Sequence, residues 1–273
     1  MTASHNVTLS DSIIEDGGKV WRQGVGVLMQ SANDSRVTHN TIRRFFYTGV
    51  SIGWTWGFAP TLNFGSVVSA NEIHTIGQGE LSDLGCIYHL GKDPGTLIEG
   101  NTCHNVSSYN YGGWGLYLDE GSSNVTVRGN LVHDVKNGGF VQHYGLNNTI
   151  ENNLLYRVDL GVGPTNWSDG ALRAARPPPR PVSAPSTHTA GPVAGGIASG
   201  AADTPGSQED RSSFTFRRNV VVIESGQMFE ASTDNGYRHM RFNSNVYFDL
   251  SRSDVSFPCD PESNRSCECK KQS

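Results

Sequence analysis

The chain has 273 residues, of which 32 are glycine and 17% are charged, and its formal net charge is -5. The sequence contains no apolar run long enough to span a membrane and no cluster of lysine or arginine in its front half, so it excludes a transmembrane helix and disfavours nucleic acid as a partner. The length fits one moderate domain with an appendage.

A short motif recurs from the first residues onward. Each copy has an apolar residue three positions before an anchor residue and another two positions after it. The anchors are Ser12, Asn40, Asn71, Asn101, Asn130, Asn153, Asn219 and Asn245. Alternating β-branched runs recur and amphipathic helical segments do not, so each copy is predicted to form short strands joined by turns. A period of this length indicates a solenoid.

Stacking these repeats predicts an all-β fold, a single-stranded right-handed parallel β-helix of about eight coils, a pectate-lyase-like solenoid. The two apolar columns would form one continuous core. The anchor asparagines would occupy the left-handed turn position and exchange amide hydrogen bonds along the stack.

Changes in composition divide the chain into four parts. Residues 1–168 are predicted to form the first part of the β-helix and 212–252 its last coils. Residues 169–211 are rich in Pro, Ala, Gly and Ser, which predicts a disordered insertion, and 253–273 are predicted to be a flexible tail that holds Cys259, Cys267 and Cys269. The coil motif begins within ten residues of Met1 without a capping element, so we expect a fragment of a longer β-helix or a chain that pairs with another element.

Two cysteines, Cys86 and Cys103, lie among apolar residues and are interpreted as small core residues, although spacing alone does not fix cysteine pairing. The N-terminus has no signal peptide, whereas several Asn-x-Ser/Thr sequons occur, including Asn105 and Asn124. These sequons suggest an extracellular or secretory location.

In four central repeats a further strand starts at a glycine, namely Gly49, Gly85, Gly115 and Gly139. Alternation places the first and third residues after the glycine inside and the second and fourth outside. The fourth position aligns Gly53, His89, Asp119 and His143. Asp119 is therefore predicted to lie between two imidazoles on the outer surface, which would keep its carboxylate ionised.

A second carboxylate, Asp83, precedes the strand that contains His89. Glycoside hydrolysis needs two acidic side chains about 5 to 10 Å apart, and adjacent coils supply that spacing. Asp83 as the acid and Asp119 as the nucleophile or base form the preferred catalytic pair. Glu120 is expected to diverge from Asp119, and it would replace Asp119 if the register slipped by one residue.

Aromatic and polar residues surround these carboxylates in the sequence. Flat rings bind the apolar faces of sugars, and polar groups at the rim bind the hydroxyls. The predicted substrate-binding residues are Trp54, Trp56, Tyr88, His89, Tyr111, Trp114, Tyr117, Gln142, His143 and Tyr144. A separate outward column of His74, His104 and His133 lacks accompanying carboxylates, so no metal site is predicted there. No cofactor is predicted for the chain.

Five segments occur in one order, "GWTWG", "IGQGELSDLGCIYHLG", "PGT", "YGGWGLYLDEGS" and "QHYG". Together they resemble carbohydrate-active right-handed parallel β-helix proteins, and glycoside hydrolase family 141 in particular. The resemblance covers roughly residues 4 to 160 and 212 to 250. It implies a plant or algal polysaccharide of the fucoside or xylan type as substrate and two catalytic acids at positions that match Asp83 and Asp119. The chain departs from the family pattern at His89, in missing N-terminal coils and in its insertion.

Two other functions remain open from the sequence. A polysaccharide lyase would need Ca²⁺ or Arg/Lys to neutralise a uronate, and the central strands offer no Arg or Lys. A truncated β-helix that binds a polysaccharide or oligosaccharide without cleaving it is the other alternative. The sequence does not address the oligomeric state.

Overall fold

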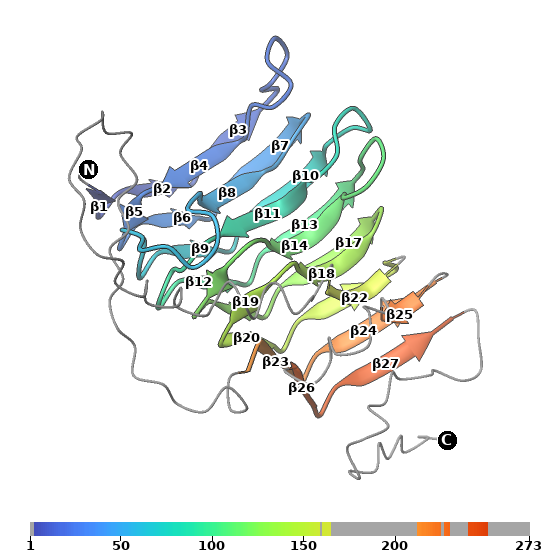
Figure 1. Ribbon diagram of the computed structural model, residues 1–273. Helices are drawn as coiled ribbons and strands as arrows, with labels where there is room; N and C mark the ends of the chain where they lie inside the picture. Colours follow the sequence, from blue (N-terminus) through green and yellow to red (C-terminus); the bar gives the residue numbers. More distant parts are fainter. Residues whose placement is uncertain (1–2, 159, 165–211, 225–226, 230–239, 251–273) are drawn as a thin grey trace, which may run out of the picture.

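The computed structural model describes residues 3–158, 160–164, 212–224, 227–229 and 240–250, and every regular element within them is a strand (Figure 1). The predicted insertion at 169–211 and tail at 253–273 lie outside the described residues, as do Cys259, Cys267 and Cys269.

Three parallel sheets contain nearly all the strands. The sheets are numbered in the order in which the chain passes through them within each coil. The first sheet holds β2 (Thr8–Ser10), β6 (Arg36–Thr38), β9 (Val67–Ser69), β12 (Leu97–Glu99), β16 (Thr126–Arg128), β20 (Asn148–Glu151), β23 (Phe214–Arg217) and β26 (Met240–Asn243). The second sheet holds β3 (Ile13–Glu15), β7 (Thr41–Phe45), β10 (Glu72–Ile76), β13 (Thr102–Val106), β17 (Leu131–Val135), β21 (Leu154–Tyr156), β24 (Val220–Ile223) and β27 (Val246–Asp249).

The third sheet holds β4 (Val27–Gln30), β8 (Val50–Gly53), β11 (Gly85–Leu90), β14 (Trp114–Leu118), β18 (Gly138–Gln142), β22 (Leu160–Pro164) and β25 (Gln227–Phe229). Two short pairs, β1 (Ser4–His5) with β5 (Ala32–Asn33) and β15 (Ser122–Ser123) with β19 (Gly145–Leu146), bridge neighbouring coils at a corner. Each strand pairs with its counterpart one coil away. The predicted parallel β-helix is therefore confirmed.

The asparagine ladder joins the first and second sheets. Asn71 Nδ2 donates to Asn101 Oδ1 at 2.9 Å, and Asn101 Nδ2 donates to Asn130 Oδ1 at 3.0 Å. The ladder crosses the insertion directly, because Asn153 Nδ2 donates to Asn219 Oδ1 at 2.9 Å. The hydrogen bonds confirm the predicted ladder and continue it from Asn153 to Asn219.

The anchor residues do not have the left-handed backbone conformation that the sequence predicts for them. The residue with positive φ is the one before each anchor: Asp11, His39, Ala70, Gly100, Gly129, Asn152, Arg218 and Ser244. The anchor then has ordinary backbone geometry. Its side chain points along the stack, where its amide reaches the next coil.

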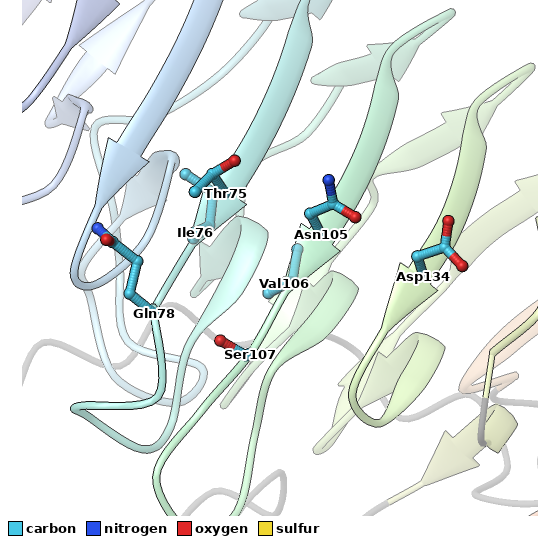
Figure 2. Close-up of a pocket in the computed structure, with 7 residues that line it drawn as sticks. All are labelled: Thr75, Ile76, Gln78, Asn105, Val106, Ser107 and Asp134. Atoms are coloured by element: carbon cyan, nitrogen blue, oxygen red, sulfur yellow. The ribbon is translucent and has the colours of Figure 1, made fainter.

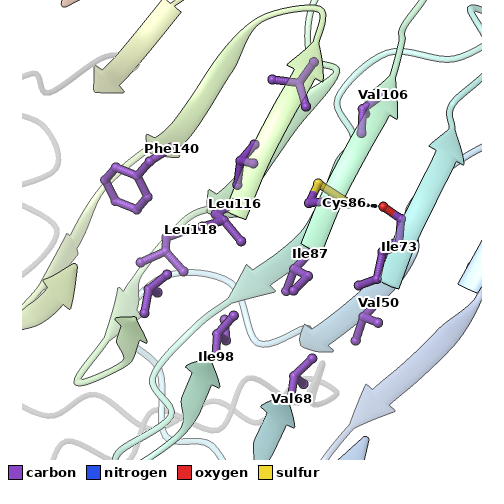
Figure 3. Close-up of a cluster of buried hydrophobic side chains, with 14 of the residues drawn as sticks. Val50, Val68, Ile73, Cys86, Ile87, Ile98, Val106, Leu116, Leu118 and Phe140 are labelled. Atoms are coloured by element: carbon purple, nitrogen blue, oxygen red, sulfur yellow. Dashed lines mark hydrogen bonds between the residues drawn. A yellow bond between two sulfur atoms is a disulfide. The ribbon is translucent and has the colours of Figure 1, made fainter. Parts of the chain in front are cut away.

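The core lies between the sheets and receives side chains from all three (Figure 3). The predicted apolar columns are buried in the central coils, where Val68, Ile73, Ile98 and Val132 are at most 1% exposed. At the C-terminal end Phe242 is 37% exposed because no further described coil covers it. Each central coil therefore buries its apolar residues against two neighbours.

A column of small residues on the third sheet faces a column of large residues on the second. A side chain on Gly49 or Gly115 would overlap Ile73 or Val132 respectively. One on Gly26 would overlap Ile42 and the Gly49 carbonyl, and one on Gly139 would be in tight contact with Leu155. Between Gly49 and Gly115 this column contains Cys86, which forms a disulfide with Cys103 on β13 of the following coil. Two medium-sized residues thus replace one small and one large residue.

The disulfide corrects the interpretation of the two cysteines. Both are fully buried core residues, as predicted, but they are bonded to each other. A disulfide sulfur carries no proton, so the 3.3 Å approach of Cys86 Sγ to the Ile73 carbonyl oxygen is a sulfur–oxygen contact (Figure 3). Cys86 therefore joins the third sheet covalently to the second.

Candidate active site

On the third sheet β11 is shifted by one residue from the predicted alignment, whereas β8, β14 and β18 align on their glycines as predicted. Cys86, not Gly85, stands in the glycine column, so His89 pairs with Leu118 rather than with Asp119. The prediction failed because it aligned strands on glycine, whereas in this coil the facing residue is Cys103 and leaves room for a side chain. The predicted placement of Asp119 between His89 and His143 is therefore wrong.

The shift turns His89 inward and Tyr88 outward. His89 is fully buried and contacts Asp93 and Ser122 inside the helix. Gln142 also lies inside, as predicted from its position, and its Nε2 donates to Ser213 Oγ at 2.6 Å. Neither of these two predicted substrate-binding residues reaches the outer surface.

Two tyrosines on adjacent coils form the base of the outer surface. The rings of Tyr88 and Tyr117 stack with centroids 4.7 Å apart and planes 11° apart, and both residues are 4% exposed. Trp114 packs on Tyr117 with a centroid distance of 4.3 Å. The stack presents two phenolic hydroxyls side by side.

These hydroxyls join the two predicted catalytic carboxylates. The Tyr88 hydroxyl donates to Asp119 Oδ2, and the Tyr117 hydroxyl donates to Asp83 Oδ1 at 3.3 Å. His143 Nδ1 donates to Asp119 Oδ1 at 3.0 Å, because an ionised carboxylate only accepts. The structure thus brings Asp83, Asp119 and His143 together around the tyrosine stack.

The environment moves the pKa values of the two carboxyl groups in opposite directions. Burial raises the pKa of Asp83, and the negative charge of Asp119 raises it further. Burial also tends to raise the pKa of Asp119, but hydrogen bonds, chiefly from His143 and Tyr88, more than offset it, so this pKa is lowered. Asp83 therefore holds a proton to a higher pH than Asp119 does.

The pKa of His143 responds to the same carboxylate. Burial by itself lowers this pKa, but the hydrogen bond and charge of Asp119, together with the charges of Glu120 and Asp83, more than offset burial and raise it. His143 consequently carries a positive charge next to Asp119 over a wider pH range than an exposed histidine does.

Glu120 does not diverge from Asp119. It follows the end of β14, where strand alternation no longer applies, and its Oε1 lies 4.0 Å from His143 Nδ1. Its Oε2 accepts a hydrogen bond from the Tyr144 hydroxyl at 2.9 Å. Glu120 is thus a third carboxylate at the same histidine.

A segment after β8 crosses the neighbouring coils beside the tyrosine stack. Gly91 and Gly121 both have positive φ, and a side chain on either would overlap the backbone of residues 55–57. Trp54 packs edge-on against Tyr88 at 5.8 Å, while Trp56 is 57% exposed. The segment places Trp54 against the tyrosine stack and Trp56 against Trp54.

The predicted aromatic residues differ in their access to solvent. Tyr111 is 53% exposed and packs against Trp114 at 6.2 Å. Tyr144 packs against the His143 ring at 5.2 Å. Trp56 and Tyr111 are therefore the rings best placed to meet a ligand, whereas Tyr88, Trp114 and Tyr117 are buried.

Tyr47 also belongs to this site, although the sequence did not indicate it. It packs against the tyrosine stack, and burial followed by the charges of Asp83 and Asp119 raises the pKa of its hydroxyl. The only signal in the sequence is an aromatic residue two positions before Gly49. That position lies in a turn, where alternation does not predict direction.

The second sheet carries the predicted histidine column. His104 stacks on His74 and on His133, with ring centroids 4.9 and 4.8 Å apart. Carboxylates do accompany this column, contrary to the sequence interpretation, since Glu72 Oε1 lies 3.6 Å from His104 Nε2. Even so, the described residues contain no group of His, Cys, Asp and Glu arranged to hold a metal ion.

A cavity of about 320 Å³ lies at the ends of β10, β13 and β17 (Figure 2). Its lining residues are Thr75, Ile76, Gln78, Asn105, Val106, Ser107 and Asp134. None of the predicted site residues lines it. Within the described parts of the chain, no helix is long and apolar enough to cross a bilayer.

The fold and its ladder define a right-handed β-helix, and the chain belongs to that family, because a family model described as a right-handed beta helix region matches residues 4–173. A solved structure titled "Glycoside hydrolase" is similar, with 26% identity and a TM-score of 0.49 over 55% of this chain. The match spans 26% of that protein, about a quarter of its length. No curated protein matches the chain.

Proposed function

We propose that the chain hydrolyses glycosidic bonds in a plant or algal polysaccharide of the fucoside or xylan type, with Asp83 and Asp119 as the catalytic pair. The observation that carries this proposal is the opposite pKa displacement of two carboxyl groups that meet at one tyrosine stack. Two carboxyl groups held in different protonation states are the requirement for glycoside hydrolysis. The motifs that resemble glycoside hydrolase family 141 support the substrate class.

In this proposal Asp83 donates its proton to the leaving glycosidic oxygen as the bond to the anomeric carbon breaks. Asp119, ionised, either attacks the anomeric carbon or removes a proton from the attacking water. His143 and Tyr88 hold its two oxygens, which fixes the direction of the carboxylate. Trp56 and Tyr111 offer exposed rings for the apolar faces of the sugars.

The test is turnover of fucosylated and xylan-type oligosaccharides by D83N and D119N. Loss of acid or base catalysis is expected to lower kcat by about 10²- to 10⁴-fold, while binding measured by calorimetry persists. E72Q is the matched control, because Glu72 is an exposed carboxylate on the second sheet. Full turnover by both aspartate variants would refute the proposed pair.

Non-catalytic glycan binding is the second candidate. The observation that favours it is the burial of Asp119, which is only 5% exposed. Binding of oligosaccharides without release of any product by the wild-type chain would support this function. Release of unsaturated, ultraviolet-absorbing products would instead indicate a polysaccharide lyase.

We also propose that the protein works outside the reducing cytoplasm. The Cys86–Cys103 disulfide supports this location, because structural disulfides persist in oxidising compartments. Thiol titration of the protein purified from its native source is the direct check.

A further inference from the structure

A buried polar cluster lies behind Asp119, on the inner side of the third sheet. His89, Asp93, Thr96 and Ser122 are each at most 1% exposed. The proposed reaction uses none of them. Buried polar groups that are fully hydrogen-bonded make a rigid unit, so the cluster is able to fix whatever backbone it contacts.

The hydrogen bonds of Ser122 have a defined direction. Its hydroxyl lies 3.0 Å from the His89 carbonyl oxygen and 2.9 Å from His89 Nδ1. The carbonyl only accepts, so it takes the single hydroxyl proton, and Nδ1 must donate to Ser122 Oγ. Ser122 and His89 are therefore joined by two reciprocal hydrogen bonds.

The other side of the imidazole is also occupied. His89 Nε2 lies 3.3 Å from Asp93 Oδ2, and Thr96 donates to Asp93 Oδ1 at 2.6 Å. Thr96 Oγ1 in turn accepts from the Ser66 amide at 3.1 Å. These bonds connect the turn at Ser122 to the first sheet.

The cluster holds the peptide groups on both sides of the Asp119 side chain. The Asp119 amide donates to the His89 carbonyl at 2.8 Å, the same carbonyl that accepts from Ser122 Oγ. The Ser122 amide donates to the Asp119 carbonyl at 3.0 Å. A displacement of Ser122 or His89 would therefore rotate the backbone that carries the carboxylate.

The order serine, histidine, aspartate resembles that of a nucleophilic triad, but the geometry excludes that role. The Ser122 proton goes to a backbone carbonyl and not to the imidazole, and the hydroxyl is fully buried. A nucleophile needs a base that takes its proton and a path to the substrate. The cluster has neither.

We infer that Ser122 and His89 are positioning residues that aim the Asp119 carboxylate, so that Oδ1 meets His143 and Oδ2 meets Tyr88. The catalytic meaning of this inference rests on the proposed function. The geometric part of the inference does not depend on that function. It states that Ser122 and His89, inside the β-helix, control the contact between Asp119 and His143.

The test compares S122A with S123A. Ser123 is a matched control, because it is 1% exposed and donates to the Gly121 carbonyl at 2.7 Å without contacting His89. The readout is the pKa of His143, followed by NMR titration. This imidazole is faced by Asp119, Glu120, Asp83 and Tyr144.

We expect S122A to move the pKa of His143 down toward its ordinary value, because Asp119 Oδ1 leaves Nδ1. If the chain hydrolyses glycosides, kcat should fall by at least about tenfold with KM unchanged, since misaimed catalytic groups slow chemistry more than binding. S123A should alter neither quantity. If S122A does not fold, H89Q tests the same bond from its other end.

If the pKa of His143 is the same in S122A as in S123A, the inference is overturned. The same holds for H89Q where it replaces S122A. The two proposals also fail separately. A wild-type chain that cleaves no glycan, together with a His143 shift confined to S122A, would remove the proposed function and keep the positioning role. An active enzyme in which S122A changes neither turnover nor the titration of His143 would keep the proposed function and remove the positioning role.

Discussion

His143 is the side chain on which the protonation of both carboxyl groups depends. Its hydrogen bond lowers the pKa of Asp119, and its charge lowers that of Asp83. In H143A both influences disappear, so both pKa values should rise. If Asp119 must be ionised and Asp83 protonated, the acid and alkaline limbs of activity both move to higher pH.

The measurement is kcat/KM against pH for wild type and H143A, whose limbs report the essential groups of the free enzyme. H39A is the control. His39 is an exposed histidine of another coil, and its Nδ1 lies 2.6 Å from Asp11 Oδ1. Limbs that stay in place in H143A would mean that Asp119 and Asp83 are not the titrating groups.

The individual site residues show what the sequence could reveal. Asp83, Asp119 and His143 could be predicted, because the repeat brings their strands together and their types suit acid–base chemistry. His89 could not, since its direction depends on whether Gly85 or Cys86 stands in the glycine column. A shift of one residue exchanges the faces of a strand.

The disulfide between Cys86 on β11 and Cys103 on β13 joins two sheets, and its removal should lower the stability of the protein. C86S/C103S removes a bond between residues 17 apart and leaves two polar atoms in the core, so it should lower the free energy of unfolding by about 3 kcal/mol or more. C86G/C103V copies the Gly115 and Val132 pair of the next coil. It loses the same covalent bond but restores apolar packing.

We therefore expect C86G/C103V to be more stable than C86S/C103S in urea unfolding, with wild type above both. Equal stability of the two double variants would show that complementary volume between the sheets contributes little. In either case Tyr88 lies two residues after Cys86, so altered turnover in these variants would report a shift of β11.

The strands and the stacked columns of anchor and apolar residues could be predicted from the sequence. The anchor asparagines and the apolar residues around them recur at one spacing, and a parallel stack is the arrangement that satisfies every copy. The left-handed residue of each turn was missed because its identity varies among Asp, His, Ala, Gly, Asn, Arg and Ser. Backbone conformation repeats there without a repeated side chain.

At the scale of the whole molecule, the stack separates two groups of histidines on different sheets. His143 belongs to the carboxylate site of the third sheet, whereas the column of His74, His104 and His133 lies on the second. Burial and then the neighbouring His104 lower the pKa of His74, whereas the contacts with Asp119 raise that of His143 despite burial. The two faces should therefore respond to pH with opposite signs.

The unfolded chain gives each histidine a pKa of about 6.5. Since the folded pKa of His74 is lower, the unfolded state binds more protons, and folding loses stability as pH falls below about 6.5. Since the folded pKa of His143 is higher, its stabilising contribution is complete below about pH 6.5 and is lost as pH rises through the folded value. Wild-type stability against urea should thus decline on both sides of a maximum. H74Q should weaken the acid-side decline, and H143Q the alkaline-side decline. A change on the same side of the stability maximum in both variants would contradict the opposite pKa displacements of these two imidazoles.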